Sequence, residues 1–405
     1  MMKQLAGGLL ATVAGVALLA GAAHAKTVVG VTDKEIKIGN TNPYSGPAST
    51  YSVIGKSIAA YFKSVNAAGG VNGRMINFIS VDDGYSPPKT KEQFRKLVEK
   101  EKVAFIFQSL GTPTNSAVHK YMNKKKVPQL FVATGATKWG QPKKFPWTMG
   151  FQPNYQTAGK IFANYIMKQR PNGKVGILYQ NDDYGKDYVI GMKIAMGDKF
   201  DKMVVKQETY EVTDPTVDSQ VVSLKAAGAD VFYNVSIPKF AAQTIKKAHA
   251  IGWKPMHVLN DVSASIASTM KPAGIDISQG ILSATYLKDP TDSAWKDDPE
   301  RKAWDKWMDE FYPDGDKKNP FNGYGYSVAT LMTHVLDQAG NDLSRENIMK
   351  TAASIENFRA PMTLPGILIN TGPDDFYPIE QMQMERVKGD AWERFGPIIG
   401  AGAGS

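Results

Sequence analysis

The first half of the chain alternates short apolar runs with segments whose apolar residues recur at helical spacing. Residues 35–40 alternate like a strand, and from residue 51 apolar side chains return every three or four positions, as on one face of a helix. The same order of strand, loop and helix returns over residues 76–98 and again over residues 103–132. Strands that alternate with helices in this way predict a parallel sheet built from right-handed crossovers.

After residue 150 the same pattern begins again. Three further helical patterns follow up to Glu356, and residues 377–385 are strand-like. We therefore expect two similar α/β halves, each a doubly wound parallel sheet. Within the second half the pattern predicts strands at residues 174–179, 203–210, 231–234, 256–259 and 280–285, and helices at residues 156–168, 217–227, 239–251 and 263–270.

The N-terminus departs from this globular pattern. A short basic start at Lys3 is followed by an apolar run over residues 5–20 and by Ala23-His24-Ala25, a small-x-small cleavage signal. The run is barely long enough to span a membrane, and the cleavage signal follows it at once. We interpret residues 1–25 as a secretory signal peptide, which predicts a protein exported to the periplasm.

Composition narrows the class of protein. A chain of 405 residues exceeds the usual size of one domain, and it contains no cysteine, so its stability must rest on hydrophobic cores rather than disulfides. The formal net charge of +9 falls to +8 without Lys3, but the cationic residues are spread out. The longest run, Lys124 to Lys126, lies where a helix should end, and cations there complement the helix dipole. We therefore expect no nucleic-acid partner.

Two loops at strand ends are candidates for ligand contact. Gly111-Thr112-Pro113-Thr114-Asn115 joins a predicted strand to a predicted helix, whose first N–H groups have no partners within the helix and suit an anion. Gly135-Ala136-Thr137 ends the next strand, and its small side chains would let a ligand approach the backbone. Each loop is equally consistent with an ordinary helix cap or a tight turn.

Catalytic constellations are missing from the sequence. The histidines are scattered without metal-ligand spacing, and no nucleophile elbow, P-loop or dinucleotide-binding fingerprint occurs. We expect no catalytic residues, no metal and no cofactor. Tyrosines near strand ends could wall a cleft between domains, although each is also consistent with packing; they are Tyr44, Tyr51, Tyr155 and Tyr184.

Taken together, these motifs resemble the type I periplasmic solute-binding proteins of bacterial ABC transporters, specifically the branched-chain amino-acid (Leu/Ile/Val) binding family. The resemblance covers essentially the whole chain after residue 25. Its motifs, in chain order, are Ile36-Lys37-Ile38-Gly39, Ser45-Gly46-Pro47 with Tyr51, Asn66-Ala67-Ala68-Gly69-Gly70-Val71-Asn72-Gly73-Arg74, Asp82-Asp83, Gly135-Ala136-Thr137 and Asp183-Tyr184-Gly185.

The resemblance implies two lobes joined by three hinge crossings, with a ligand enclosed when the lobes close. Crossings near residues 150, 285 and 371 would give a first lobe of residues 26–150 plus 286–371 and a second lobe of residues 151–285 plus 372–405. It further implies that the first lobe holds a ligand carboxylate through Gly111, Thr112 and the loop of Gly135, Ala136 and Thr137, under the ring of Tyr51.

The second lobe departs from the family pattern. Family members that bind amino acids carry a tyrosine where this chain has Ser236, and an acidic residue for the ligand ammonium near Asn260 and Asp261. Together with Tyr184, these positions should set specificity. The predicted function is capture of a branched-chain or other hydrophobic amino acid for an inner-membrane ABC permease, by a monomer. Aromatic or other small carboxylates, amides, a ligand-sensing receptor and an α/β enzyme stay open as alternatives.

Overall fold

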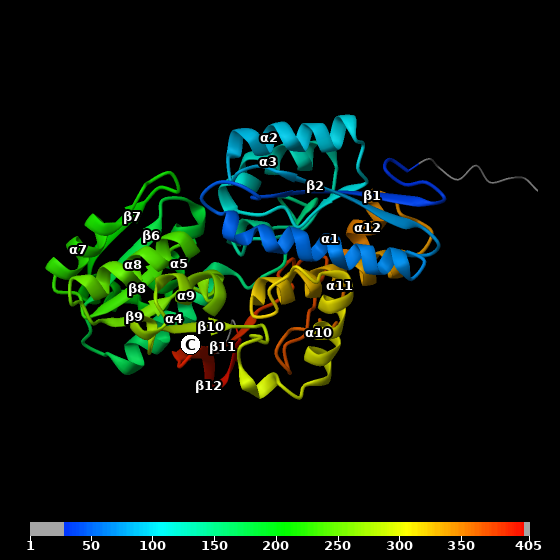
Figure 1. The fold of residues 1–405 in the computed structure, drawn as a ribbon. Helices are drawn as coiled ribbons and strands as arrows, with labels where there is room; N and C mark the ends of the chain where they lie inside the picture. The colour runs from blue at the N-terminus through cyan, green and yellow to red at the C-terminus, as the bar shows by residue number, and fades with distance from the viewer. Residues whose placement is uncertain (1–27, 401–405) are drawn as a thin grey trace, which may run out of the picture.

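The chain forms two lobes, each built on one β-sheet with helices packed around it (Figure 1). The computed structural model describes residues 28–400, so the predicted signal peptide lies outside the described residues. Within residues 28–400 no helix combines the length and the apolar character needed to cross a membrane.

The sheet of the first lobe is entirely parallel, as the sequence pattern predicts. Its outer strands are β2 and β5, and β1 and β3 pair side by side near its middle. In spatial order the strands are β2 (Met75–Asp82), β1 (Glu35–Asn42), β3 (Phe105–Phe107), β4 (Gln129–Val132) and β5 (Thr148–Gly150).

The sheet of the second lobe is mainly parallel, as predicted, and two antiparallel strands extend it at one edge. Five strands are parallel, but β11 runs antiparallel to β10, and β12 runs antiparallel to β11. In spatial order the strands are β12 (Ala391–Gly400), β11 (Gln381–Lys388), β10 (Leu282–Thr285), β9 (Met256–Leu259), β8 (Val231–Val235), β6 (Val175–Gln180) and β7 (Val204–Tyr210).

The helices divide between the lobes in the same way as the strands. Around the first sheet lie α1 (Ser52–Ala67), α2 (Pro87–Arg95), α3 (Thr112–Lys125), α10 (Pro299–Phe311), α11 (Pro320–Ala339) and α12 (Arg345–Ala352). Around the second lie α4 (Tyr155–Gln169), α5 (Asp183–Met196), α6 (Phe200–Met203), α7 (Asp218–Ala226), α8 (Pro238–Ala250) and α9 (Lys271–Ala273).

Short 3₁₀ and π segments complete the fold. The helix predicted for residues 263–270 is not a regular α-helix, and a 3₁₀ turn and a π turn take its place. The loop after β9 first forms a turn in which the Ser263 N–H donates to the carbonyl of Asn260, and the π turn follows it. These segments are η1 (Ser49–Tyr51), η2 (Lys96–Lys100), η3 (Thr137–Gly140), η4 (Gly197–Lys199), η5 (Asp261–Ser263), η6 (Ile266–Met270), η7 (Asp276–Ser278) and η8 (Ser293–Trp295).

Apolar periodicity and polar caps explain the long helices. On α1, Ile54, Ile58 and Phe62 are buried against the first sheet, as their spacing predicts. On α5, the Asp182 carboxylate accepts the N–H groups of Tyr184 at 2.9 Å and Gly185 at 3.3 Å. This cap satisfies helix donors that have no partner within the helix, and it fixes where α5 begins.

The chain passes three times between the two sheets. The last strand of the first sheet ends at Gly150, and β10 of the second sheet ends at Thr285, where the chain returns to the first lobe. The third crossing leads from α12 to β11, which begins at Gln381. The exact boundaries stay predictions.

Two glycines allow α4 and α5 to pack at backbone distance. A Cβ atom at Gly191 would lie 2.2 Å from the carbonyl oxygen of Gln156, and one at Gly159 would lie 2.3 Å from that of Tyr188. Real Cβ atoms do not approach so closely, so any side chain here would push the helices apart. This close packing determines where the tyrosines of α4 and α5 lie.

Candidate ligand-binding cleft

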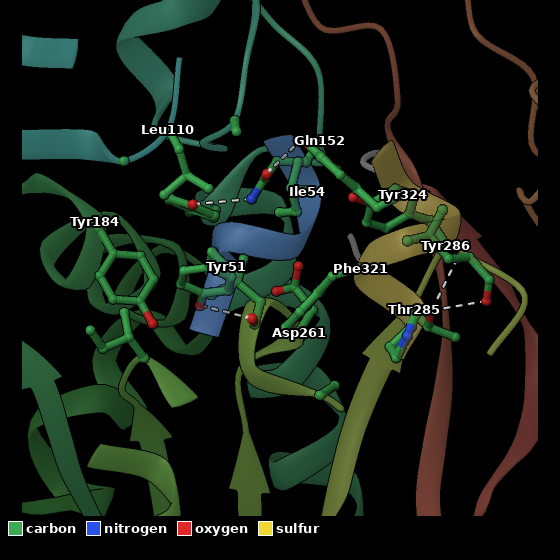
Figure 2. Close-up of a pocket in the computed structure, with 18 of the residues that line it drawn as sticks. Tyr51, Ile54, Leu110, Gln152, Tyr184, Asp261, Thr285, Tyr286, Phe321 and Tyr324 are labelled. Atoms are coloured by element: carbon green, nitrogen blue, oxygen red, sulfur yellow. Dashed lines mark hydrogen bonds between the residues drawn. The ribbon is translucent and has the colours of Figure 1, made fainter. Parts of the chain in front are cut away.

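A cavity lies between the two lobes, at the carboxyl ends of strands from both sheets (Figure 2). This is where ligands bind in open α/β sheets. The cavity offers about 90 Å³ to the centres of water molecules, several times the roughly 10–15 Å³ that one buried water needs. It therefore suits a small organic molecule.

On the side of the first lobe, the cavity meets the N-terminus of α3. Gly111 caps this helix with φ of +100°, a conformation that favours glycine, and both Gly111 and Thr112 line the cavity. The hydroxyl oxygens of Thr112 and Thr134 lie 2.6 Å apart. The Gly111 N–H already donates to the carbonyl of Ala133 at 3.3 Å and Pro113 has no N–H, so it is chiefly the positive end of the helix dipole that makes this wall suitable for an anionic group.

Aromatic rings form the sides of the cavity. Six tyrosines line it, and the ring of Tyr51 lies 5.2 Å from that of Phe321, while Tyr155 lies 5.3 Å from Tyr184. Burial raises the pKa of both Tyr51 and Tyr184, so these phenols are neutral. The hydroxyl of Tyr184 is buried and has no hydrogen-bond partner among the described residues, which leaves it available to a ligand.

A half-buried carboxyl group faces the cavity from the second lobe. Asp261, just beyond β9, lines the cavity (Figure 2). Its carboxylate accepts a hydrogen bond from the hydroxyl of Tyr188. Burial raises its pKa to about 6, against the lowering effect of the Tyr188 hydrogen bond. None of the described residues that line the cavity is a lysine, arginine or histidine. A cationic ligand group would therefore find its counter-ion in Asp261.

The lobes are closed over this cavity. The Tyr51 hydroxyl of the first lobe donates to the carbonyl of Val262 in the second at 3.0 Å. Next to the cavity, Lys138 forms an ion pair with Asp183 of α5 across the lobes. These contacts join the lobes around the enclosed space, so a ligand must enter before closure.

The structure brings together five of the ten residues predicted to contact the ligand. All five line the same cavity, although they come from both lobes and lie far apart in the sequence: Tyr51, Gly111, Thr112, Tyr184 and Asp261.

The loop of Gly135, Ala136 and Thr137 lies outside the lining of the cavity. A Cβ atom at Gly135 would lie 2.2 Å from the carbonyl oxygen of Pro153, so this loop packs against the hinge segment instead. The Thr137 N–H donates to Asp187 of α5 at 2.7 Å. The structure thus uses this loop for contact between the lobes.

Ser236 and Asn260 also lie behind the lining. The Ser236 hydroxyl donates to the side chain of Asn234, and its carbonyl accepts the Asn260 side-chain N–H at 2.9 Å. The Ser236 carbonyl also accepts the hydroxyl of Ser263. These bonds tie the ends of β8 and β9 together, and they thereby support the turn that presents Asp261.

The sequence pattern missed most of the lining. Tyr155, expected as a wall of the cleft although not as a ligand contact, does line the cavity, whereas no sequence signal pointed to Asp289 or Glu385. Apart from the five predicted residues, the lining consists of Ile54, Tyr85, Leu110, Ala133, Gln152, Tyr155, Ile237, Val262, Ala264, Ala284, Thr285, Tyr286, Leu287, Asp289, Pro320, Phe321, Tyr324 and Glu385.

Known proteins resemble this chain over most of its length. The profile of a family described as periplasmic binding protein matches residues 35–391. Leu/Ile/Val-binding protein homolog 7 of Brucella suis biovar 1 (strain 1330) is 27% identical over 288 residues, which cover 69% of each chain.

Solved structures share the fold. A branched chain amino acid ABC transporter structure from Thermus thermophilus with bound valine superposes with a TM-score of 0.82 at 16% identity, covering 91% of this chain and 97% of that one. The fatty acid ABC transporter substrate-binding protein from Thermomonospora curvata superposes with a TM-score of 0.77 at 21% identity, covering 94% and 96%. The two-lobed fold predicted from the sequence is confirmed.

Proposed function

This chain belongs to the periplasmic binding protein family, and we propose that it captures a small α-amino acid between its lobes and presents it to an inner-membrane ABC permease. As a member of a family of binding proteins it is not an enzyme. The predicted signal peptide accords with a periplasmic location, and we propose that the protein acts as a monomer.

One observation carries this proposal: the N-terminus of α3 and the carboxyl group of Asp261 face the same cavity from different lobes. The N-terminus of α3, with Gly111 and Thr112, suits a carboxylate, whereas Asp261 suits an ammonium group. The zwitterionic head of an α-amino acid carries both groups. Because it would contact both lobes, it would stabilise the closed form relative to the open one, and closure is the signal that a permease can recognise.

The relatives favour an aliphatic side chain. The Brucella suis protein is named for leucine, isoleucine and valine, and the Thermus thermophilus structure contains valine. The rings of Tyr51 and Phe321 and the side chains of Ile54 and Leu110 offer an apolar wall for such a chain. A carboxylate without an ammonium group, as in a fatty acid, is the alternative, but it would leave Asp261 without a positively charged partner.

A thermal-shift panel tests the proposal by comparing amino acids with their deaminated acids, for example leucine with 4-methylpentanoate. A ligand at about 100 times its dissociation constant adds roughly 2.7 kcal/mol to the free energy of unfolding. We expect amino acids to raise the melting temperature and the deaminated acids to raise it much less. Equal shifts for the two classes would remove the role of Asp261, and no shift with any amino acid would refute the proposal.

Binding of the amino acid should weaken as the pH falls through 6. Burial raises the pKa of Asp261 to about 6, so about a tenth of this group is ionised at pH 5. Affinity measured by calorimetry should then be roughly tenfold lower at pH 5 than at pH 7, and protonation of Asp289, whose pKa burial also raises to about 6, would steepen the change. An affinity that stays constant from pH 7 to pH 5 would contradict an ionised Asp261 as the partner of the ammonium.

In the ligand-free protein, the raised pKa of Asp261 makes folding stability fall, not rise, as the pH increases. Because the pKa of Asp261 in the folded state exceeds its ordinary value of 3.8, the folded chain binds this proton more tightly than the unfolded chain. The contribution of Asp261 to stability is therefore present below pH 4 and is lost as the pH rises through 6. A bound ammonium offsets that loss.

A further inference from the structure

A second carboxyl group, Glu385, faces the cavity at its hinge end. Glu385 lies on β11, opposite Ser283 of β10, and lines the cavity although the residue is only 1% exposed. Its Oε2 atom is buried and has no hydrogen-bond partner in the described part of the chain. An unpaired buried carboxylate oxygen is costly, so a donor from a ligand would relieve it.

Asp289 adds to the negative character of this end. It follows β10, lines the same cavity and accepts the N–H of Thr291 at 2.7 Å. Burial raises the pKa of Asp289 to about 6, and burial together with repulsion from Asp289 and Asp261 raises the pKa of Glu385. The three carboxyl groups therefore lie within electrostatic reach of one another.

The cations nearby are already paired with other carboxylates. Lys288 is buried and donates to both oxygens of Asp298 at 2.9 Å and to Glu300 at 2.5 Å. Arg394 lowers the pKa of Glu385 from a distance, but its Nε atom donates to Asp292 at 3.0 Å. Neither cation lines the cavity, so neither neutralises Glu385 at the cavity surface.

A metal ion does not account for these carboxyl groups. Within residues 28–400 no three side chains of His, Cys, Asp or Glu converge closely enough to hold one. Instead the carboxyl groups are spread along the cavity, with Asp261 beyond β9 and Glu385 on β11. An organic ligand with separated positive groups fits this arrangement.

The spacing matches a short aliphatic chain. One strand, β10, lies between β9 and β11, so their axes are about 10 Å apart at the usual strand separation. Six bonds separate the two nitrogen atoms of lysine, and an extended chain of that length spans roughly 7 Å. Hydrogen bonds from each nitrogen atom to a carboxyl oxygen add to the distance that the ligand can bridge. Val262 and Ala284, which also line the cavity, offer apolar surface against which methylene groups can pack.

We propose that Glu385, together with Asp289, binds a second positively charged group of the ligand, and that the ligand is an α-amino acid whose aliphatic side chain ends in an amino or guanidino group. This inference rests on the proposed function and narrows it. The α-carboxylate and α-ammonium lie as described above, and the terminal cation occupies the hinge end of the cavity.

Lysine and norleucine provide the test, because they differ in the terminal ammonium group. Calorimetry on the wild-type protein should give at least tenfold tighter binding for lysine, with ornithine and arginine as further probes. In Glu385→Gln the preference for lysine over norleucine should fall to near one, while Glu310→Gln, which removes an exposed carboxylate of α10, should leave it unchanged.

The possible results distinguish failure of this inference from failure of the proposed function. If norleucine binds as tightly as lysine to the wild-type protein, the inference is wrong and capture of an amino acid stands. If Glu385→Gln weakens both ligands equally, Glu385 has only a structural role and the inference is again wrong. If no amino acid binds, the proposed function fails, and the inference fails with it.

Discussion

Replacing Asp261 by asparagine should weaken binding of the amino acid by about 30-fold to several thousand-fold. Removing one partner of a buried, hydrogen-bonded charge pair costs about 2–5 kcal/mol of binding free energy. Asparagine is close in shape and keeps an oxygen that can accept from Tyr188, so the loss would report the charge rather than the packing. Isothermal titration calorimetry with the best ligand of the thermal-shift panel measures this change.

The control for this variant is Asp198→Asn, which removes an exposed carboxylate from the same lobe. It should bind as the wild-type protein does. The Asp261→Asn variant should also lose most of the pH dependence between 5 and 7. Unchanged affinity in Asp261→Asn would mean that the ligand places no positive group against this side chain.

The substitution Gly191→Ala should destabilise the fold by about 1–3 kcal/mol, the usual cost of overpacking. Alanine is the better helix former, yet the new methyl group would lie 2.2 Å from the carbonyl oxygen of Gln156. The helices α4 and α5 would have to separate. Because α5 carries Tyr184 and Tyr188, ligand affinity should fall as well. Urea unfolding and calorimetry measure the two effects.

A matched control for Gly191 is available in α11. A Cβ atom at Gly323 would meet Met362 at 3.5 Å, an ordinary van der Waals distance. The change Gly323→Ala should therefore be neutral or stabilise the protein by up to about 1 kcal/mol through helix propensity. If Gly191→Ala proved as stable as Gly323→Ala, the close approach of α4 and α5 would not contribute to stability as described.

The sequence predicted the elements that carry strong periodic patterns. The strands β1 and β6 and the helices α1 and α4 lie within a few residues of their predicted positions, because one face of each is apolar and buried. The order of these elements was enough to predict the α/β class, and the family resemblance predicted the division into two lobes.

The strand-like pattern of residues 377–385 overlaps β11, but β12 could not be predicted in the same way. Strand β12 contains Gly396, with φ of +69°, and Pro397, which cannot donate to a sheet. Both residues are tolerated because β12 lies at the edge of the sheet. Its position beside β11, and the antiparallel direction of both strands, depend on tertiary contacts that no local pattern encodes.

The binding site was only half predictable for a related reason. Loops such as those of Thr112 and Thr137 read alike in the sequence, yet the first faces the cavity and the second contacts the other lobe. The difference arises from the packing of Gly135 against Pro153, which involves the hinge. Glu385 gave no signal, since a charged residue in an alternating strand ordinarily faces water.

The pairing of β10 with β11 also bears on the order in which the protein can fold. Leu282 pairs with Arg386, so the two strands meet only after the whole return path through the first lobe has been made. Contacts of such long range form late, since a large loop must close first. During synthesis from the N-terminus, most of both lobes can thus form before Glu385 has been made, and the cavity is completed only when the segment that contains β11 is added.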